Sequence, residues 1–299
     1  MSTAAAANSD KRRTLQQIEW LRCAACAIVV AAHCDTRCIE AGAVAVVLFL
    51  TVSVEFARRS PKTRVINGRI RKTLELWLFW SAIYSIVVMA RSVAKDGSPF
   101  SGFKPWMALT GPSHHLWYLP ALALALATSG WCFGGPGGYR GRSLAIVVAL
   151  LVPIAMEGTA ALGHPVPLPQ FAAALFSFCC ALAIGSVLPE AMPRHAGAIG
   201  WILVLLALCA VLLLPSVWIA RALAVTGALL LCRATQDSSS RALLWASSLT
   251  AGIYLIHMAV ALTVEFAFGL TLAWMPAILI ASAALVAAIR RTPLRWIAP

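Results

Sequence analysis

The stretch that decides the fold is Ile18–His33, IEWLRCAACAIVVAAH, which is followed almost at once by Ala41–Phe56, AGAVAVVLFLTVSVEF. The first run has a basic flank at Lys11, Arg12 and Arg13, and a basic flank before an apolar run also describes a signal peptide. Glu19 and Arg22 lie inside the run, however, and a second apolar run follows it. We therefore predict a first membrane helix that stays in the protein.

The composition extends this prediction to the whole chain of 299 residues. Hydrophobic residues make up 61% and charged residues 12%, with a mean hydropathy of +0.83. A soluble domain has about 25% charged residues, so this chain has too little polar surface for water. Further apolar runs follow at about 73–90, 114–132, 144–161, 171–188, 198–214, 216–232, 242–264 and 270–289. The fold class that we predict is an all-α membrane bundle of about ten transmembrane helices.

The charge distribution predicts the orientation of this bundle. The net charge is +13, and of the 24 Lys and Arg residues 18 fall in segments that an even number of spans assigns to the cytoplasm, Arg233 among them. Only four fall in the outer segments, as the positive-inside rule requires. We therefore expect a cytoplasmic tail at 1–17, a membrane domain at 18–289 and a cytoplasmic tail at 290–299. The placement of basic residues on the cytoplasmic side accounts for most of the net positive charge, so we expect no nucleic-acid partner.

The first predicted helix carries three ionisable side chains on one face. Arg22 and His33 are 11 residues apart, which is about three helical turns and about 16 Å along the axis. Glu19 lies one turn before Arg22, at pairing distance on the same side. An interfacial ion pair and a structural histidine would explain each residue separately. Because ionisable groups inside a span are costly, their shared face favours a functional stripe.

Two later patches also bring histidine and aromatic side chains into the membrane region. Ser113-His114-His115-Leu116-Trp117-Tyr118 opens the fourth span, where an interfacial aromatic belt is the simpler interpretation. Gly252-Ile253-Tyr254-Leu255-Ile256-His257 lies midway along the ninth span. A histidine at that depth needs a polar partner, which favours function for His257.

For the remaining polar residues the sequence predicts simpler roles. The basic segment from Arg58 to Lys72 is either a sidedness signal that touches acidic lipid or a site for phosphate. Glu55 is expected to pair with Arg58 or Arg59, one turn further on. Near the outer helix ends we expect three side chains to meet water: Glu157, Arg221 and Glu265.

The cysteines do not predict a metal site. Cys23 and Cys26 have a metal-like spacing, but no second pair accompanies them. Cys34 and Cys38 lie at the outer end of the first helix and could oxidise if that side faces the periplasm.

In this order the motifs resemble those of acyltransferase family 3, the integral-membrane O-acyltransferases. The family opens with an acidic residue, then Arg, ten residues and His, as Glu19, Arg22 and His33 do here. A Ser-Gly pair and a basic stretch follow, for which this chain has Ser53-Val54 and Arg69-Ile70-Arg71-Lys72. His115-Leu116-Trp117-Tyr118-Leu119 and Gly252–His257 are similar to the family's later segments. The resemblance covers residues 18 to about 260, without an extracytoplasmic domain.

The resemblance implies transfer of an acyl group, usually acetyl, from cytoplasmic acetyl-CoA to a hydroxyl of a carbohydrate or a lipid-linked glycan. It implies a multi-pass protein of the bacterial cytoplasmic membrane, with acyl-CoA as co-substrate and no permanently bound cofactor. His33 is the expected general base, and Arg22 and Glu19, on the same face of the helix, are the further catalytic candidates. Arg69, Arg71 and Lys72 are expected to hold the CoA phosphates. Candidates for oxyanion or acceptor binding complete the expected site: Ser53, His115, Trp117, Tyr118, Tyr254 and His257.

Two other functions compete with this one. A transporter or channel for an anionic or proton-coupled solute would also place Arg, Glu and His inside a bundle. The chain has neither an inverted repeat nor paired Gly/Pro-broken spans, which weakens that alternative. Val54 replaces the family's Gly, so an inactive scaffold is the third interpretation. The acceptor, the acyl chain length and the oligomeric state do not follow from the sequence.

Overall fold

A computed structural model describes residues 16–59, 63–113, 115–133, 141–159, 168–213, 217–234 and 240–298. Ten helices of 15 residues or more occur in these ranges. They are α2 (Gln16–Cys34), α3 (Ile39–Arg59), α4 (Thr63–Asp96), α6 (Tyr118–Phe133), α7 (Arg142–Gly158), α8 (Leu168–Gly185), α9 (His195–Leu213), α10 (Val217–Arg233), α11 (Arg241–Phe268) and α12 (Met275–Ile289). Short helices complete the list: η1 (Thr36–Cys38), α5 (Met107–Thr110), η3 (Leu272–Trp274) and η4 (Pro293–Ile297).

Each predicted span coincides with one of the ten long helices. Six of them, α2, α3, α4, α8, α11 and α12, are long and apolar enough to cross a membrane, and α6 and α9 contain shorter apolar helices. The predicted division between the seventh and eighth spans is confirmed, since α9 ends at Leu213 and α10 begins at Val217. The protein is therefore an α-helical membrane protein. Ten crossings with both termini in the cytoplasm stay a prediction.

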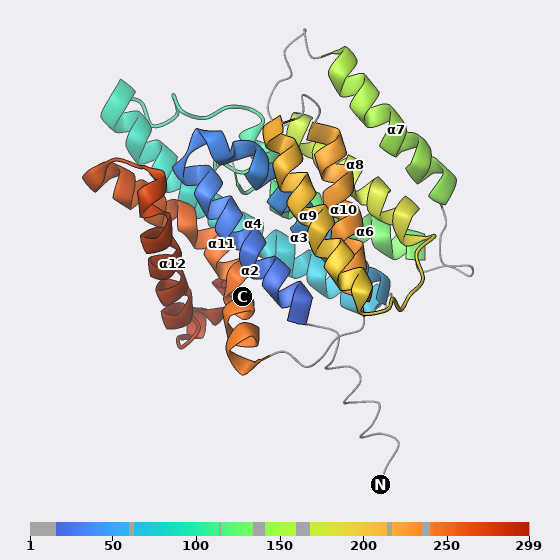
Figure 1. The fold of residues 1–299 in the computed structure, drawn as a ribbon. Helices are drawn as coiled ribbons and strands as arrows, with labels where there is room; N and C mark the ends of the chain where they lie inside the picture. The colour runs from blue at the N-terminus through green and yellow to red at the C-terminus, as the bar shows by residue number, and fades with distance from the viewer. Residues whose placement is uncertain are drawn as a thin grey trace. The chain divides into compact units, whose positions relative to one another are not determined.

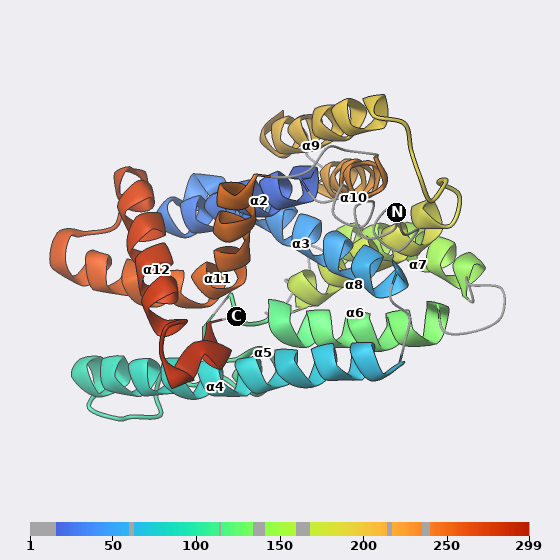
Figure 2. The same cartoon turned by 90° about the horizontal axis from the view of Figure 1, so that it is seen from below.

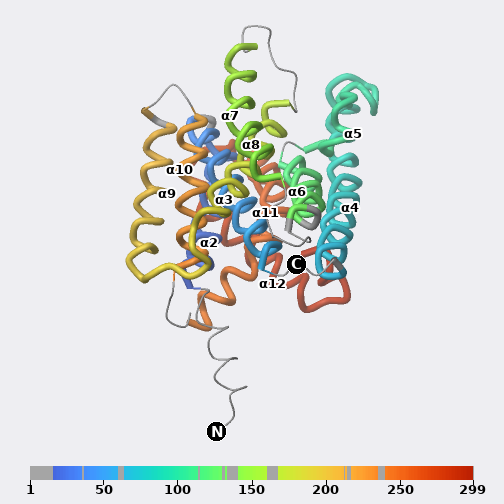
Figure 3. Tube along the Cα trace, turned by 90° about the vertical axis from the view of Figure 1, so that its right-hand side faces the viewer, coloured from blue at the N-terminus to red at the C-terminus, as the bar shows by residue number. Residues whose placement is uncertain are grey.

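The chain forms two compact units, and their boundaries along the sequence fall within α3 and α8. Unit 1 contains the described residues up to Glu55 and those from Ile184 onward, and unit 2 contains those from Phe56 to Ala183. In unit 1, α2 packs along α11 and also contacts α10 and α12 (Figures 1 and 3). Because α2 has neighbours on several sides, its polar face is enclosed by protein.

The tightest helix pair of unit 1 is α9 with α10. A Cβ added to Gly200 would lie 2.9 Å from the backbone oxygen of Gly227, and one added to Gly227 would lie 2.7 Å from that of Gly200. Small residues allow membrane helices to approach this closely. The pair fixes α10, which carries two buried arginines.

In unit 2, α4 and α6 lie side by side and antiparallel (Figure 2). Ala57, Ile66 and Leu126 form a buried apolar cluster at one end of this pair. With 34 residues, α4 is about 51 Å long, which exceeds the bilayer's hydrocarbon core of about 30 Å. Its basic first turns can therefore extend into the aqueous phase.

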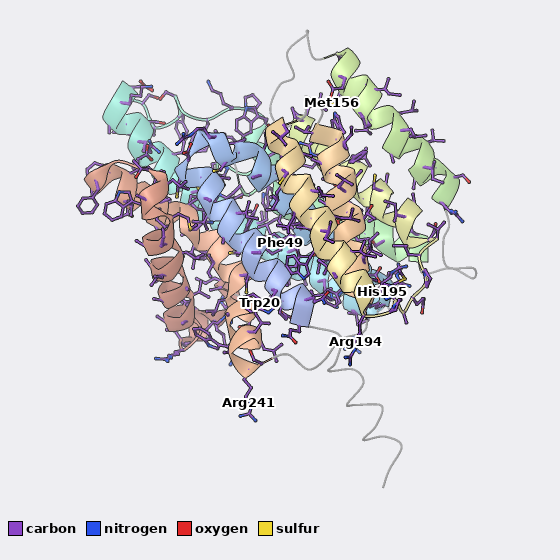
Figure 4. All side chains as sticks on the ribbon, in the orientation of Figure 1. Trp20, Phe49, Met156, Arg194, His195 and Arg241 are labelled. Carbon is purple, nitrogen blue, oxygen red and sulfur yellow. The ribbon has the colours of Figure 1, made fainter. Side chains whose placement is uncertain are left out.

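Basic side chains of unit 1 gather at the end where α2 begins. Figure 4 places Trp20, near the start of α2, toward the same end as Arg194, His195 and Arg241. Arg194, His195 and Arg241 are exposed. Which side of the membrane this end faces stays a prediction from the charge distribution.

Candidate functional site

The contact between α2 and α11 is lined by polar groups at three levels. From one end to the other, Glu19 meets Ser247, Cys26 meets the backbone of Thr250, and His33 meets His257. The α2 positions are seven residues apart, so every second helical turn presents a polar side chain to α11. We call these six residues the polar seam. It confirms that Glu19 and His33 share a face.

At the first level of the seam, Glu19 accepts two hydrogen bonds. The Ser247 hydroxyl donates to Glu19 Oε2, and Arg22 Nη1 lies 3.4 Å from the same oxygen. Glu19 is buried, whereas the Arg22 side chain keeps 29% of its surface exposed. The predicted pair of Glu19 with Arg22 is therefore confirmed, and the arginine retains donors for a further ligand.

At the last level of the seam, the rings of His33 and His257 are 5.1 Å apart between centroids. His257 Nδ1 lies 3.1 Å from the carbonyl oxygen of Ile253. A carbonyl can only accept, so Nδ1 carries a proton, and in the neutral ring Nε2 presents a lone pair. His257 is fully buried, while His33 is partly exposed. His33 is therefore the imidazole of the two that a substrate can reach.

An aromatic ring of α11 packs against the histidine pair. The Tyr254 ring is 6.0 Å from that of His257 and 6.3 Å from that of Phe49 on α3. Tyr254 is buried. The structure thus brings the predicted residues His33, Tyr254 and His257 together.

A second histidine environment forms within unit 2. His115 is buried, and its Nδ1 lies 2.9 Å from Ser113 Oγ. The Tyr84 ring meets the His115 ring edge-on at 5.1 Å, and Trp80 lies 5.9 Å from Tyr84. Trp117 contacts Phe171 and Tyr118 instead. His115 is therefore buried inside the protein, unlike a residue of the interfacial aromatic belt that we considered for this segment.

The basic residues predicted to hold phosphate lie on the first turns of α4. Arg71 and Lys72 are exposed and Arg69 is partly exposed. Arg71 Nε forms an ion pair with Glu75 at 2.6 Å, one turn further on. Their role as a phosphate site stays a prediction.

The comparison with known families decides the class of protein. The family model described as an acyltransferase domain, that of acyltransferase family 3, matches residues 15–291, which is nearly the whole chain. The chain belongs to this family. No curated protein and no solved structure matches it. The protein is thus a membrane acyltransferase, and the transporter interpretation is not favoured.

The departure of this acyltransferase from its family at Val54 is accommodated locally. Ser53 Oγ donates to the Phe49 carbonyl at 2.8 Å, one turn back within α3. Val54 is buried and its helix is continuous. The hydroxyl of Ser53 is therefore satisfied by its own helix.

Two residues of the acyltransferase that the sequence did not single out extend the first level of the seam. Ser247 bonds to Glu19, as described above. Arg290, just after α12, donates from Nη1 to Ser248 Oγ at 2.8 Å and from Nη2 to the Ser248 carbonyl at 2.5 Å. Burial and then the neighbouring charge of Arg22 lower the pKa of Arg290. Two guanidinium groups thus lie near each other, a feature that sequence spacing across 268 residues does not reveal.

Glu55 has a distant partner that the sequence did not predict. Arg233 is fully buried, and its Nε and Nη2 lie 3.2 and 3.1 Å from the two Glu55 oxygens. Its Nη1 donates to the Leu188 carbonyl at 2.6 Å and to that of Pro189 at 3.4 Å. The sequence counted Arg233 among the cytoplasmic sidedness charges, but folding encloses it because its partner lies 178 positions earlier in the chain.

The expectation that Arg221 meets water is wrong. Only 8% of this residue is exposed, whereas Glu157 and Glu265 are exposed as predicted. Arg221 is buried because it lies on the side of α10 that packs within unit 1 and because the Trp218 ring covers its guanidinium, with Cζ 4.5 Å from the ring centroid. All nine cysteines, Cys34 and Cys38 included, are free thiols.

Proposed function

We propose that this acyltransferase transfers an acetyl group from cytoplasmic acetyl-CoA to a hydroxyl of a carbohydrate or glycolipid acceptor at the outer face of the bacterial cytoplasmic membrane. The observation that carries the proposal is the polar seam, which joins an arginine-rich end to a pair of histidines. From Glu19 to His33 the seam extends about 21 Å at the helical rise per residue. It therefore links two depths of the membrane within one packed helix pair.

The arginine-rich end fits the polyanionic part of the donor. Arg22 and Arg290 lie close enough to interact electrostatically, and both keep exposed surface. Guanidinium groups bind phosphate oxygens through two parallel hydrogen bonds. We assign the CoA phosphates to Arg22 and Arg290. The phosphate-binding role of Arg69, Arg71 and Lys72 stays a prediction from the sequence.

The histidine end fits proton transfer. In the proposed step, His33 takes the proton of the acceptor hydroxyl while its oxygen attacks the thioester carbonyl carbon. The tetrahedral oxyanion then collapses, the carbon–sulfur bond breaks, and the proton passes from His33 to the leaving thiolate. The products are an O-acetyl ester and free CoA thiol, so atoms and charge balance.

His257 acts in this scheme as a positioning residue. With its Nδ1 proton held by Ile253, its Nε2 is an acceptor beside His33. Two imidazolium ions at this distance would repel each other. The two rings together are therefore expected to bind no more than one extra proton. Burial of His257 thereby helps to keep His33 available as a base.

The proposal is tested with purified protein, labelled acetyl-CoA and a set of soluble methyl glycosides as acceptors. Replacing His33 by Ala is expected to lower CoA release about 10²–10⁴-fold, the usual contribution of a general base. His195→Ala is the matched control, because His195 is an exposed histidine at the start of α9. Undiminished turnover in His33→Ala would remove His33 from the chemistry. Solute flux into liposomes without thioester loss would support a transporter instead.

A further inference from the structure

Arg221 is a buried cation that the described residues leave without a hydrogen-bonding partner. Its Nε is buried and donates to no acceptor, and no carboxylate of the described chain lies within ion-pair distance of its guanidinium. Burying an uncompensated charge in a membrane protein is costly. Charged side chains that a membrane protein keeps at such positions usually act on a ligand or an ion.

The surroundings of Arg221 orient it without neutralising it. The Trp218 ring lies one turn back along α10, so the arginine side chain extends toward the beginning of that helix. The ring attracts the cation at one face and leaves the edge of the guanidinium, which carries the N–H donors, for another group. Arg221 keeps 8% of its surface exposed, so its burial is not complete.

Glu40, on the first turn of α3, is the carboxylate whose charge acts on Arg221. Glu40 is exposed, and it lies beyond ion-pair distance of Arg221. Exposed, hydrated charges interact weakly. The positive charge of Arg221 is thus available, and the nearby start of α10 adds the partial positive charge of a helix N-terminus.

We propose that Arg221 binds an oxyanion, a carboxylate or a phosphate, at the outer end of α10. A forked guanidinium held by an aromatic ring matches the two oxygens of such a group. This inference rests on the proposed function for the identity of the ligand, because the acceptor is the substrate expected at that end. It specifies the acceptor class as an acidic sugar or a phosphate-linked glycan.

The experiment measures binding directly, so that it does not depend on acyl transfer. Protein in neutral detergent with phosphatidylcholine is titrated with inorganic phosphate, with a methyl glucuronide and with the uncharged methyl glucoside. Thermal unfolding reports binding, because a ligand of the folded state raises the Tm. Both anions are expected to raise the Tm of the wild type, and the neutral glucoside to leave it unchanged.

Variants then locate the site. Arg221→Gln is expected to weaken anion binding at least tenfold, and Arg221→Lys less, because lysine keeps the charge but loses the fork. Arg37→Gln is the matched control, since Arg37 is an exposed arginine that is already paired with Asp35. It is expected to bind like the wild type. Arg221→Lys also keeps the test decisive if the Gln variant does not fold.

Glu40→Gln separates the proposed site from a structural pair. If Arg221 is an anion site, this variant binds the anions as well as the wild type or more tightly. If anions bind only after Glu40 is neutralised, Glu40 is the partner of Arg221 and the proposal is overturned.

A last arm distinguishes the source of the anion. Replacing part of the phosphatidylcholine by phosphatidylglycerol supplies a lipid phosphate. A difference between wild type and Arg221→Gln that requires this lipid identifies a headgroup as the ligand, and one that needs only glucuronide or phosphate identifies an acceptor group. Equal behaviour of the two proteins in every arm overturns the proposal. His33→Ala is expected to bind the anions normally, so a failure of the proposed reaction remains distinguishable.

Discussion

Each end of α10 carries a buried arginine, and the two arginines differ in their hydrogen-bond partners. Arg233 at the end of the helix is fully buried and reaches two carboxylate oxygens and two backbone carbonyls. Arg221, three turns earlier, is almost as buried but is covered by an aromatic ring and has no hydrogen-bond partner in the described chain. One arginine completes a structural network, and the other keeps its donors. Burial alone therefore does not distinguish structure from function, whereas the set of partners does.

The largest effect is expected at Arg233. Replacing it by Met leaves the Glu55 carboxylate and the Leu188 carbonyl buried without their partner, so the free energy of unfolding is expected to fall by about 3–5 kcal/mol. Thermal unfolding of the purified protein measures the change. The double variant Glu55→Leu/Arg233→Met is expected to recover most of this loss. If the double variant is as unstable as the single one, the network contributes by packing and not by charge.

A smaller effect of the opposite sign is expected at Arg221. Replacing it by Met removes a buried charge that lacks a partner, at the cost of a cation–π contact of about 2 kcal/mol. The Tm is therefore expected to stay unchanged or to rise, measured under the same conditions as Arg233→Met. A loss as large as that at Arg233 would show that Arg221 is structural, and the contrast between the two would disappear.

The same cation–π contact sets the upper limit of the effect at Trp218. Trp218→Leu keeps an apolar residue but removes the ring that attracts the guanidinium, so a loss of no more than about 2 kcal/mol is expected. Unfolding of Trp218→Leu in the Arg221→Met background provides the control, because the ring then has no cation to attract. Equal losses in the two backgrounds would mean that Trp218 acts through packing alone.

The smallest effect is expected at the exposed pair of Asp35 with Arg37. Hydrogen bonds from Arg37 hold the pKa of Asp35 below its ordinary value. The pair therefore stabilises the fold above the unfolded-state pKa of Asp35 and loses this contribution as the pH falls through the lowered value. Because Arg37 is exposed and Asp35 is only partly buried, Arg37→Gln is expected to leave the Tm at pH 7 unchanged. A clear drop would place this turn in a larger network.

Hydropathy predicted the fold well because a bilayer selects for apolar segments of one length. Each predicted span therefore coincides with a helix. Local helical spacing also predicted the bond between Glu19 and Arg22, since residues three apart are neighbours on a helix surface. The same rule did not reveal the distant partner of Glu55, which is Arg233 on another helix.

The candidate site was predictable only along single helices. His33 and His257 were each singled out, but their contact depends on which face of α11 meets α2. Ser247 and Arg290 carried no signal, because a serine in an apolar helix and a basic residue after one are ordinary features.

By itself, the sequence determined that this protein is a helical membrane protein, where its helices lie and to which family it belongs. These properties follow from composition, local periodicity and motif order, which are all written along the chain. Tertiary structure alone decided which polar groups became partners and which did not. An ion pair, a histidine contact or a cation without a partner depends on helices that are distant in sequence and adjacent in space. The sequence singled out neither Arg221 nor Arg233 as buried, and only packing makes one a proposed binding site and the other a structural residue.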